Sequence, residues 1–135
     1  MFEGIINGLF HALEGWNLLL IIFGTFLGIV FGSMPGLTAT MGLALLVPFT
    51  FGMEPAAGLI MLAGIYVGAM YADAIPAILI NTPGTPAAIA TTFDGFPLAQ
   101  KGKAQQALVT AAFASFIGSV IANIVLATSA EPLAE

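Results

Sequence analysis

Long apolar runs, separated by short polar segments that contain proline and glycine, make up most of the chain. Leu18 to Met34 is uninterrupted and ends at Pro35-Gly36. A second run, Leu37 to Phe51, follows at once, and a third extends from Ala56 to Tyr71. The last, Ala107 to Ala130, has the length of about 20 residues that a helix needs to cross a bilayer. The pattern predicts helices throughout.

The first residues have a different pattern. Between residues 2 and 14, Ile5, Leu9, Ala12 and Leu13 share one helical face, while the polar side chains lie largely away from it. This predicts a short interfacial helix over residues 1–16, anchored by Trp16 at the membrane surface.

Glycines recur every fourth residue in two of the runs. They are Gly24, Gly28 and Gly32 in the first and Gly64 and Gly68 in the third. In lipid this spacing allows another helix to approach closely. A stripe of small and polar residues in the last run, Ala111, Ser115, Ser119 and Asn123, is also interpreted as a helix-packing face.

The composition indicates whether the chain lies in water or in a membrane. Apolar residues make up 59% of the 135 residues and charged residues only 7%, and the mean hydropathy is +1.06. Soluble domains have roughly a quarter charged residues. No charged residue or histidine lies between Glu14 and Glu54, and none between Lys103 and Glu131. A lipid bilayer is therefore the expected environment.

Several classes of function are disfavoured by what the sequence lacks. It has no cysteine and one histidine, His11, so no metal site is expected. Two lysines are too few for a nucleic-acid surface. Gly102-Lys103 is followed by Ala104, so the phosphate-loop pattern fails. An enzyme is not expected.

Two helix-breaking motifs stand out against this apolar background. They are Pro35-Gly36-Leu37-Thr38 and Asn81-Thr82-Pro83-Gly84-Thr85-Pro86. Around the first, residues 18–51 form either one broken span or a re-entrant hairpin, and the sequence leaves both open. Around the second, residues 56–93 are expected to form a broken span.

Paired helix breaks in a membrane protein are typical of transporter binding sites. A helix that restarts after a break presents free N–H groups and the positive end of its dipole, which attract anions. The alternative is that proline and glycine only kink the helices. The residues predicted to bind an anionic substrate are Pro35, Gly36, Thr38, Asn81, Thr82, Pro83, Gly84 and Thr85, with Thr40 as a further hydrogen-bonding group.

Two aspartates receive different interpretations. Asp73 is the one acid inside a long apolar stretch, so we consider it a proton or sodium site. The competing interpretation is a cap for a helix that begins at Ala74, with Pro76 in its first turn. Asp94 and Gly95 are expected to form a turn that opens a polar loop over residues 94–106. Lys101 and Lys103 in that loop favour a cytoplasmic position.

These motifs resemble the N-terminal part of the large membrane subunit of tripartite tricarboxylate transporters, the TctA family. The resemblance covers roughly residues 18 to 126. Its motifs are Gly24-xxx-Gly28-xxx-Gly32-xx-Pro35-Gly36-Leu37, Tyr66-Val-Gly68-Ala-Met-Tyr71, Ile78 to Pro86 and Thr92 to Ala104. Two positions depart from the family pattern: Ala72-Asp73 stands where many members have a glycine, and Pro76 where a serine is frequent.

The resemblance implies an ion-driven secondary transporter for di- or tricarboxylates in a bacterial inner membrane. It implies coupling to Na⁺ or H⁺, no other cofactor, and three partners: a small membrane subunit, a periplasmic solute-binding protein and the carboxylate substrate. Members are several times longer, so residues 1–135 are interpreted as one membrane domain, an N-terminal fragment of a longer subunit.

The expected fold is all-α, a polytopic membrane protein with three to four transmembrane helices, some broken or re-entrant at Pro-Gly motifs; residues 107–130 form the last span. The main rival function is a truncated or assembly fragment without transport activity of its own. A third hypothesis is a small channel-forming oligomer held together by the glycine faces.

Overall fold

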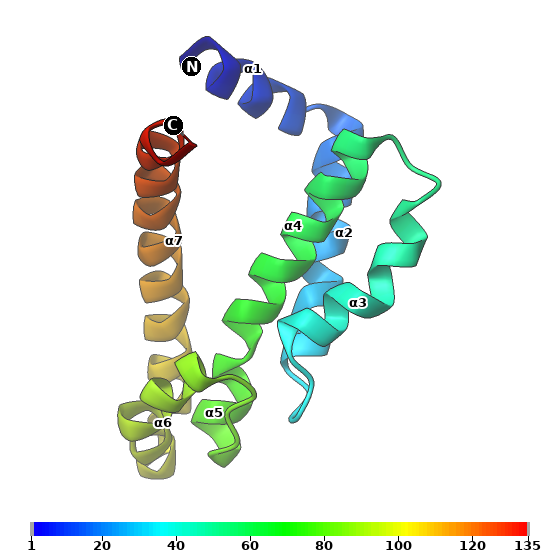
Figure 1. Cartoon of the computed structure of the whole chain (residues 1–135). Coiled ribbons are helices and arrows are strands. Elements are labelled where there is room, and N and C mark those ends of the chain that lie inside the picture. The colour runs from blue at the N-terminus through cyan, green and yellow to red at the C-terminus, as the bar shows by residue number, and fades with distance from the viewer. Residues whose placement is uncertain (1, 135) are drawn as a thin grey trace.

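The computed structural model describes residues 2–134, with side chains described for residue 4 and residues 6–129. Every regular element of the described chain is a helix, as expected (Figure 1). Its elements are α1 (Phe2–Ala12), α2 (Gly15–Gly32), α3 (Ala39–Thr50), α4 (Pro55–Ala72), α5 (Ala74–Ile80), α6 (Pro86–Leu98), a π-helical turn η1 (Ala99–Lys103) and α7 (Ala104–Ala134).

Three stretches are long and apolar enough to cross a membrane: Gly15–Gly32, Pro55–Ile80 and Pro86–Ser129. The all-α, multi-span fold class is therefore confirmed. Helix α1 and the last turns of α7 lie towards the same end of the molecule (Figure 1). Helix α3 is apolar but, at 12 residues, extends only about 18 Å at 1.5 Å per residue, which is too short to span a bilayer of about 30 Å.

Helices α2 and α4 form the closest pair, and glycine makes their approach possible. A methyl group on Gly24, Gly28 or Gly32 would overlap the backbone carbonyl oxygens of α4. From the other side, a methyl group on Gly68 would overlap the Thr25 carbonyl oxygen, and one on Gly64 would lie 2.9 Å from that of Ile21. Both predicted glycine faces are thus confirmed as packing faces, and each packs against the other.

The first helix break produces a hairpin. Helix α3 returns from the far end of α2 and lies against α4 and α2 (Figure 1). Its apolar residues Leu43 and Leu46 pack on a buried cluster formed by Leu20 of α2 and Met61 and Ile65 of α4. Of the two interpretations left open for residues 18–51, the structure therefore favours the hairpin over a continuous broken span.

Helices α4 and α5 are two parts of one long, bent segment. Asp73 joins them with right-handed helical backbone angles, φ −59° and ψ −24°. Pro76 has no backbone N–H, so it cannot complete the hydrogen bond to the carbonyl of Ala72 that a continuous helix would contain. A proline of this kind is an established cause of a kink, and the bend lies where Pro76 requires it.

The expected polar loop over residues 94–106 is helical instead. Asp94 and Gly95 lie inside α6, and η1 connects α6 to α7. The chain changes direction at Gly102, whose φ of +76° suits glycine. Gly95 is needed for packing, because a methyl group there would lie 2.8 Å from Cγ1 of Ile78 on α5. The turn predicted from Asp94-Gly95 is therefore wrong.

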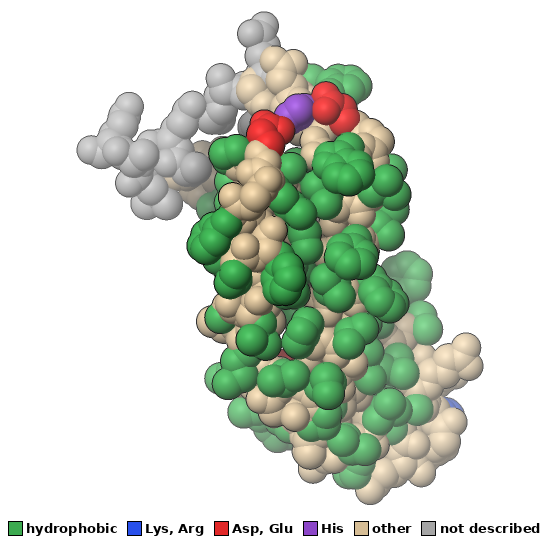
Figure 2. All heavy atoms as spheres, turned by 90° about the vertical axis from the view of Figure 1, so that its right-hand side faces the viewer, with side chains coloured by type: hydrophobic (Ala, Val, Ile, Leu, Met, Phe, Trp, Pro, Cys, Tyr) green, Lys and Arg blue, Asp and Glu red, His purple; other side chains and the backbone are tan. Residues whose placement is uncertain are grey.

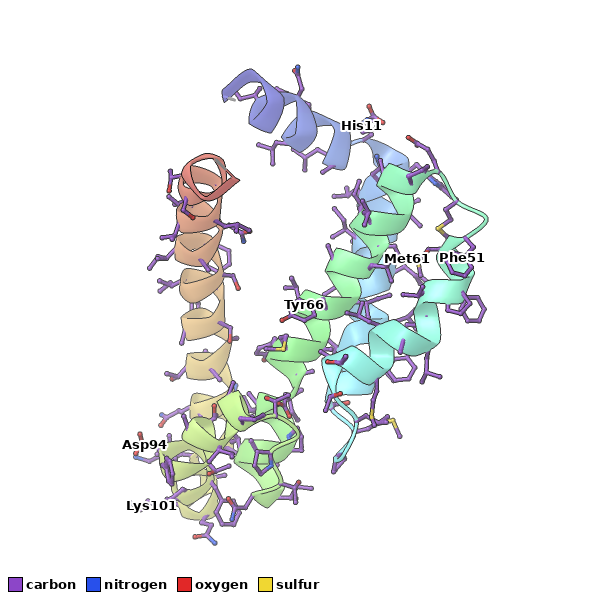
Figure 3. The ribbon with its side chains drawn as sticks, viewed as in Figure 1. His11, Phe51, Met61, Tyr66, Asp94 and Lys101 are labelled. Carbon is purple, nitrogen blue, oxygen red and sulfur yellow. The ribbon has the colours of Figure 1, made fainter. Side chains whose placement is uncertain are left out.

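The exposed charged side chains of the described residues lie at the two ends of the molecule. In Figure 2, acidic and histidine side chains gather at one end of the visible face, a basic side chain marks the other, and hydrophobic side chains lie between. Figure 3 places His11 at the first end and Lys101 at the second. The intervening surface carries large exposed apolar side chains such as Phe23, Phe26 and Phe116. This distribution fits a bilayer around the middle of the molecule.

The corner between α1 and α2 is fixed by a buried polar contact. Asn17, only 4% exposed, donates a hydrogen bond of 2.8 Å to the carbonyl of His11. His11 Nδ1 lies 2.8 Å from a Glu14 carboxylate oxygen. The hydrogen bond to Glu14 and the negative charge of Glu14 raise the pKa of His11 above its usual 6.5, and the charge of Glu54 adds a weaker effect in the same direction. Trp16, predicted as the anchor of the interfacial helix, lies in the first turn of α2 and is exposed.

Candidate substrate and ion site at the helix breaks

Both helix breaks end in a threonine that caps the helix after it. The Thr38 side chain accepts a hydrogen bond of 3.3 Å from the N–H of Met41 in α3. The Thr85 side chain accepts one of 3.4 Å from the N–H of Ala88 in α6. Both residues have the extended backbone that an N-cap requires. The two helix-breaking motifs therefore form the same local structure, a threonine N-cap at the start of the next helix.

Each break also contains a residue with positive φ. Gly36 has φ +87°, and Asn81 has φ +57° and ψ +34°. The N–H groups of Asn81 and Thr82 both bond to the carbonyl of Pro76, which closes the end of α5. Asparagine is one of the few side chains that adopt this conformation readily. Asn81 therefore has a backbone role that does not depend on any ligand.

Asp73 belongs to the α4–α5 joint, and its side chain is buried beside the start of α6. It is 4% exposed, and its Oδ1 accepts a hydrogen bond of 2.7 Å from the N–H of Gly84. Its Oδ2 accepts a close hydrogen bond from the hydroxyl of Thr85. The side chain makes no cap to α5, so the capping alternative is wrong. Its carboxylate instead occupies the anion position at the positive end of the α6 dipole.

The two breaks meet at Gly84. A methyl group on Gly84 would lie 2.6 Å from Asp73 Oδ1 and 3.3 Å from the carbonyl oxygen of Leu37, which belongs to the first break. Three separate segments, the α4–α5 joint and the loops that precede α3 and α6, therefore come into contact here. A side chain at this position would displace the Asp73 carboxylate and crowd the Leu37 carbonyl.

A cavity of about 400 Å³ opens beside this contact, between α6 and the beginning of α7. Its size falls within the range of small-molecule sites in proteins. Polar lining residues come from several elements: Asp73, Thr85, Thr91, Asp94, Thr110 and Ser115. The lining contains two acids and no lysine, arginine or histidine.

Comparison with known proteins identifies the family. The sequence profile described as "Tripartite tricarboxylate transporter TctA family" matches residues 18–135. The chain belongs to the TctA family. This is a family of transporter components and not an enzyme family.

The chain matches part of a longer curated relative. The chain is 45% identical over 123 residues to an uncharacterized 52.8 kDa protein from the TAR-I ttuC' 3' region of Agrobacterium vitis. The match covers 91% of this chain and 24% of that relative. The chain thus corresponds to about a quarter of the relative. No solved structure matches the chain.

Within this TctA-family chain, the predicted site residues differ in accessibility. Thr38, Pro83, Gly84 and Thr85 are half-buried around Asp73 and the junction of the two breaks. The other four predicted residues, Pro35, Gly36, Asn81 and Thr82, are exposed. Asp94, also exposed, reaches the same cavity as Asp73.

Sequence reasoning did not identify the contributions of Leu37 and α7. Leu37 acts through its carbonyl oxygen, which carries no residue-specific signal. The last span contributes Thr110 and Ser115 to the cavity. Ser115 and Ser119, assigned to a packing face, instead line a second hollow of about 660 Å³ between α7 and the α2–α4 pair. The four-residue spacing of these serines predicted that they share one face of α7, but it did not indicate that this face lines a hollow.

Proposed function

We propose that this chain forms part of a secondary active transporter for di- or tricarboxylates such as citrate, driven by an ion gradient. The main support is the convergence of the two helix breaks at Gly84 and Leu37, beside the buried carboxylate of Asp73. Broken helices that meet at membrane depth are the usual architecture of transporter sites. Family membership supports the transport class.

The proposed substrate site uses the N-terminal ends of α3 and α6. Each end offers a partial positive charge, and each carries a threonine hydroxyl, from Thr38 or Thr85. A substrate with two or three carboxylates suits two adjacent anion positions better than one carboxylate would. The exposed Asn81 and Thr82 side chains then provide further hydrogen bonds at the edge of the site.

The proposed partners are those that the family implies: a small membrane subunit and a periplasmic solute-binding protein. We place the chain in a bacterial inner membrane. The end of the molecule with Lys101 and Lys103 then faces the cytoplasm, because basic residues favour that side. The opposite end, with His11, Glu14 and Glu54, faces the periplasm, where a binding protein delivers its substrate.

Uptake by the complete transporter tests this proposal. The full-length membrane subunit containing this segment, with its partner subunits, is reconstituted in proteoliposomes, and labelled citrate and smaller di- and tricarboxylates are offered under Na⁺ or proton gradients. Thr38→Val and Thr85→Val should each raise the KM for the transported acid. Thr128→Val is the matched control, because among the described residues Thr128 bonds to carbonyls of its own helix alone.

Two results would contradict the proposal. If none of these acids accumulates under any gradient, the rival function, a membrane assembly fragment without transport activity of its own, is preferred. If uptake occurs but both threonine variants behave like Thr128→Val, the substrate lies elsewhere in the transporter.

A further inference from the structure

Asp73 and a substrate carboxylate would require the same hydrogen-bond donors. The N–H of Gly84 and the hydroxyl of Thr85 are the donors that α6 presents at its start, and both already bond to Asp73. A substrate carboxylate can bind there only after Asp73 has released them. The described structure therefore shows this half of the proposed site closed by a carboxylate of the chain itself.

The surroundings of Asp73 favour neutralisation by a small cation. The acid is buried, and the cavity beside it contains Asp94 as its other charged group. Met70 of α4, Ala74 and Ile78 of α5 and the cavity residues of α7 carry no charge. The loop from Ser33 to Thr38 has no titratable side chain. No basic group of the described cavity lining therefore balances the Asp73 carboxylate.

Oxygen atoms that a cation prefers gather at the same place. The carbonyl oxygen of Leu37 and Oδ1 of Asp73 both approach Gly84, at 3.3 Å and 2.6 Å from the position of its absent methyl group. Carbonyl, carboxylate and hydroxyl oxygens are ligands for hard cations, and the same carboxylate accepts a proton. A cavity lined by two acids repels a free tricarboxylate but attracts cations towards Asp73.

We propose that Asp73 couples the ion to the substrate by holding the Gly84 and Thr85 donors until a proton or Na⁺ neutralises it. This inference rests on the proposed function. The neutralised acid is a weaker hydrogen-bond acceptor, so the Gly84 N–H and the Thr85 hydroxyl then donate to the substrate carboxylate instead. Asp73 is in this sense a positioning residue, and it makes substrate affinity depend on the cation.

The test compares citrate binding to the full-length subunit with and without cation. Citrate affinity is measured at fixed pH with Na⁺ or with choline, and then without Na⁺ across a pH series, which separates the two cations. In the native protein one cation should raise citrate affinity by a factor in the range typical of allosteric coupling, about 5-fold to about 150-fold. In Asp73→Asn, which is neutral at every pH, that factor should fall to about one.

Transport gives a second measurement that a purely structural role would not reproduce. Asp73→Asn should retain exchange of citrate across the membrane but lose accumulation driven by the ion gradient. Glu54→Gln is the matched control, since Glu54 is an exposed acid at the other end of α4 without a side-chain cap. It should retain the native cation dependence.

Thr85→Val keeps the test decisive if Asp73→Asn fails to fold. It removes one of the two donors from Asp73 and should reduce the cation factor, whereas Thr85→Ser, which retains the hydroxyl, should restore it. Native cation dependence in Asp73→Asn or Thr85→Val overturns the inference, and so does loss of citrate exchange in a folded Asp73→Asn. If the native transporter binds none of the acids tested, the proposed function fails as well, which is a different result from either of these.

Discussion

Small residues have opposite roles in two regions: the α2–α4 pair, and the place where α5, α6 and α7 meet around Asp73 and Gly84, which we call the α5–α6–α7 corner. In the pair, glycines bring two backbones into direct contact over several turns, and the interface leaves no room for a methyl group. At the corner, Gly84 makes room for a carboxylate and a carbonyl, and a cavity of about 400 Å³ remains beside them. The first region is built to stay packed, whereas the second retains space and charge.

The largest effect is expected from filling the glycine interface. In Gly28→Ala the new methyl group would overlap the Ile65 carbonyl oxygen and lie 2.9 Å from the Ala69 nitrogen, so two helix backbones must separate. We expect a loss of about 3 kcal/mol, the upper part of the usual range for overpacking. Denaturation of the purified subunit in detergent measures it.

Gly118→Ala is the matched control for that substitution. Gly118 lies on α7, and apart from its own helix backbone no atom of the described residues lies within 4 Å of the position of a methyl group. Its stability should stay within about 1 kcal/mol of native, because alanine favours a helix slightly more than glycine does. Equal losses in both variants would show that the α2–α4 contact is not specially close.

The second-largest effect on stability is expected from Asp73 at the α5–α6–α7 corner. Asp73→Ala leaves the Gly84 N–H and the Thr85 hydroxyl without their acceptor. Loss of a buried partner costs about 1–3 kcal/mol, so we expect roughly 2 kcal/mol in the same denaturation experiment. The exposed Asp94→Ala should change stability by less than about 0.5 kcal/mol. If Asp73→Ala is as stable as native, the hydrogen bonds of Asp73 do not stabilise the corner.

A smaller effect separates the backbone role of Asn81 from a role in binding. Asn81→Ala should cost about 1–2 kcal/mol, because alanine is strained at φ +57°. Asn81→Gly should fold as stably as the native chain. A higher KM for citrate in Asn81→Gly would then be due to the missing side chain, whereas native uptake in that variant would remove Asn81 from the substrate site.

The smallest effect concerns pH at the opposite end of the molecule. Because Glu14 raises the pKa of His11, the pair stabilises the fold when His11 is protonated. That contribution is fully present below the usual pKa of 6.5 and is lost as the pH rises through the raised value. Glu14→Gln should lower the His11 pKa in an NMR titration. An unchanged pKa would show that the ion pair does not form in solution.

Much of the fold could be predicted from local patterns. Run lengths and the scarcity of charge indicated membrane helices, and the four-residue glycine spacing indicated close packing, because both signals lie within one helix. The two Pro-Gly motifs marked breaks. The polar stretch over residues 94–106 predicts a loop, because polar residues with glycine and proline usually form one. Here those residues are helical and form the corner before α7.

The sequence by itself determined the solvent, the helices, their breaks and the glycine faces, since these follow from composition and from spacing along a single element. Only the tertiary structure decided that α3 returns as a hairpin and that the two breaks meet. It also decided that Asp73 binds Gly84, 11 residues away, instead of capping α5. Such contacts depend on how helices cross and where Pro76 bends them. No local pattern encodes which carbonyl or hydroxyl will then lie opposite a buried carboxylate.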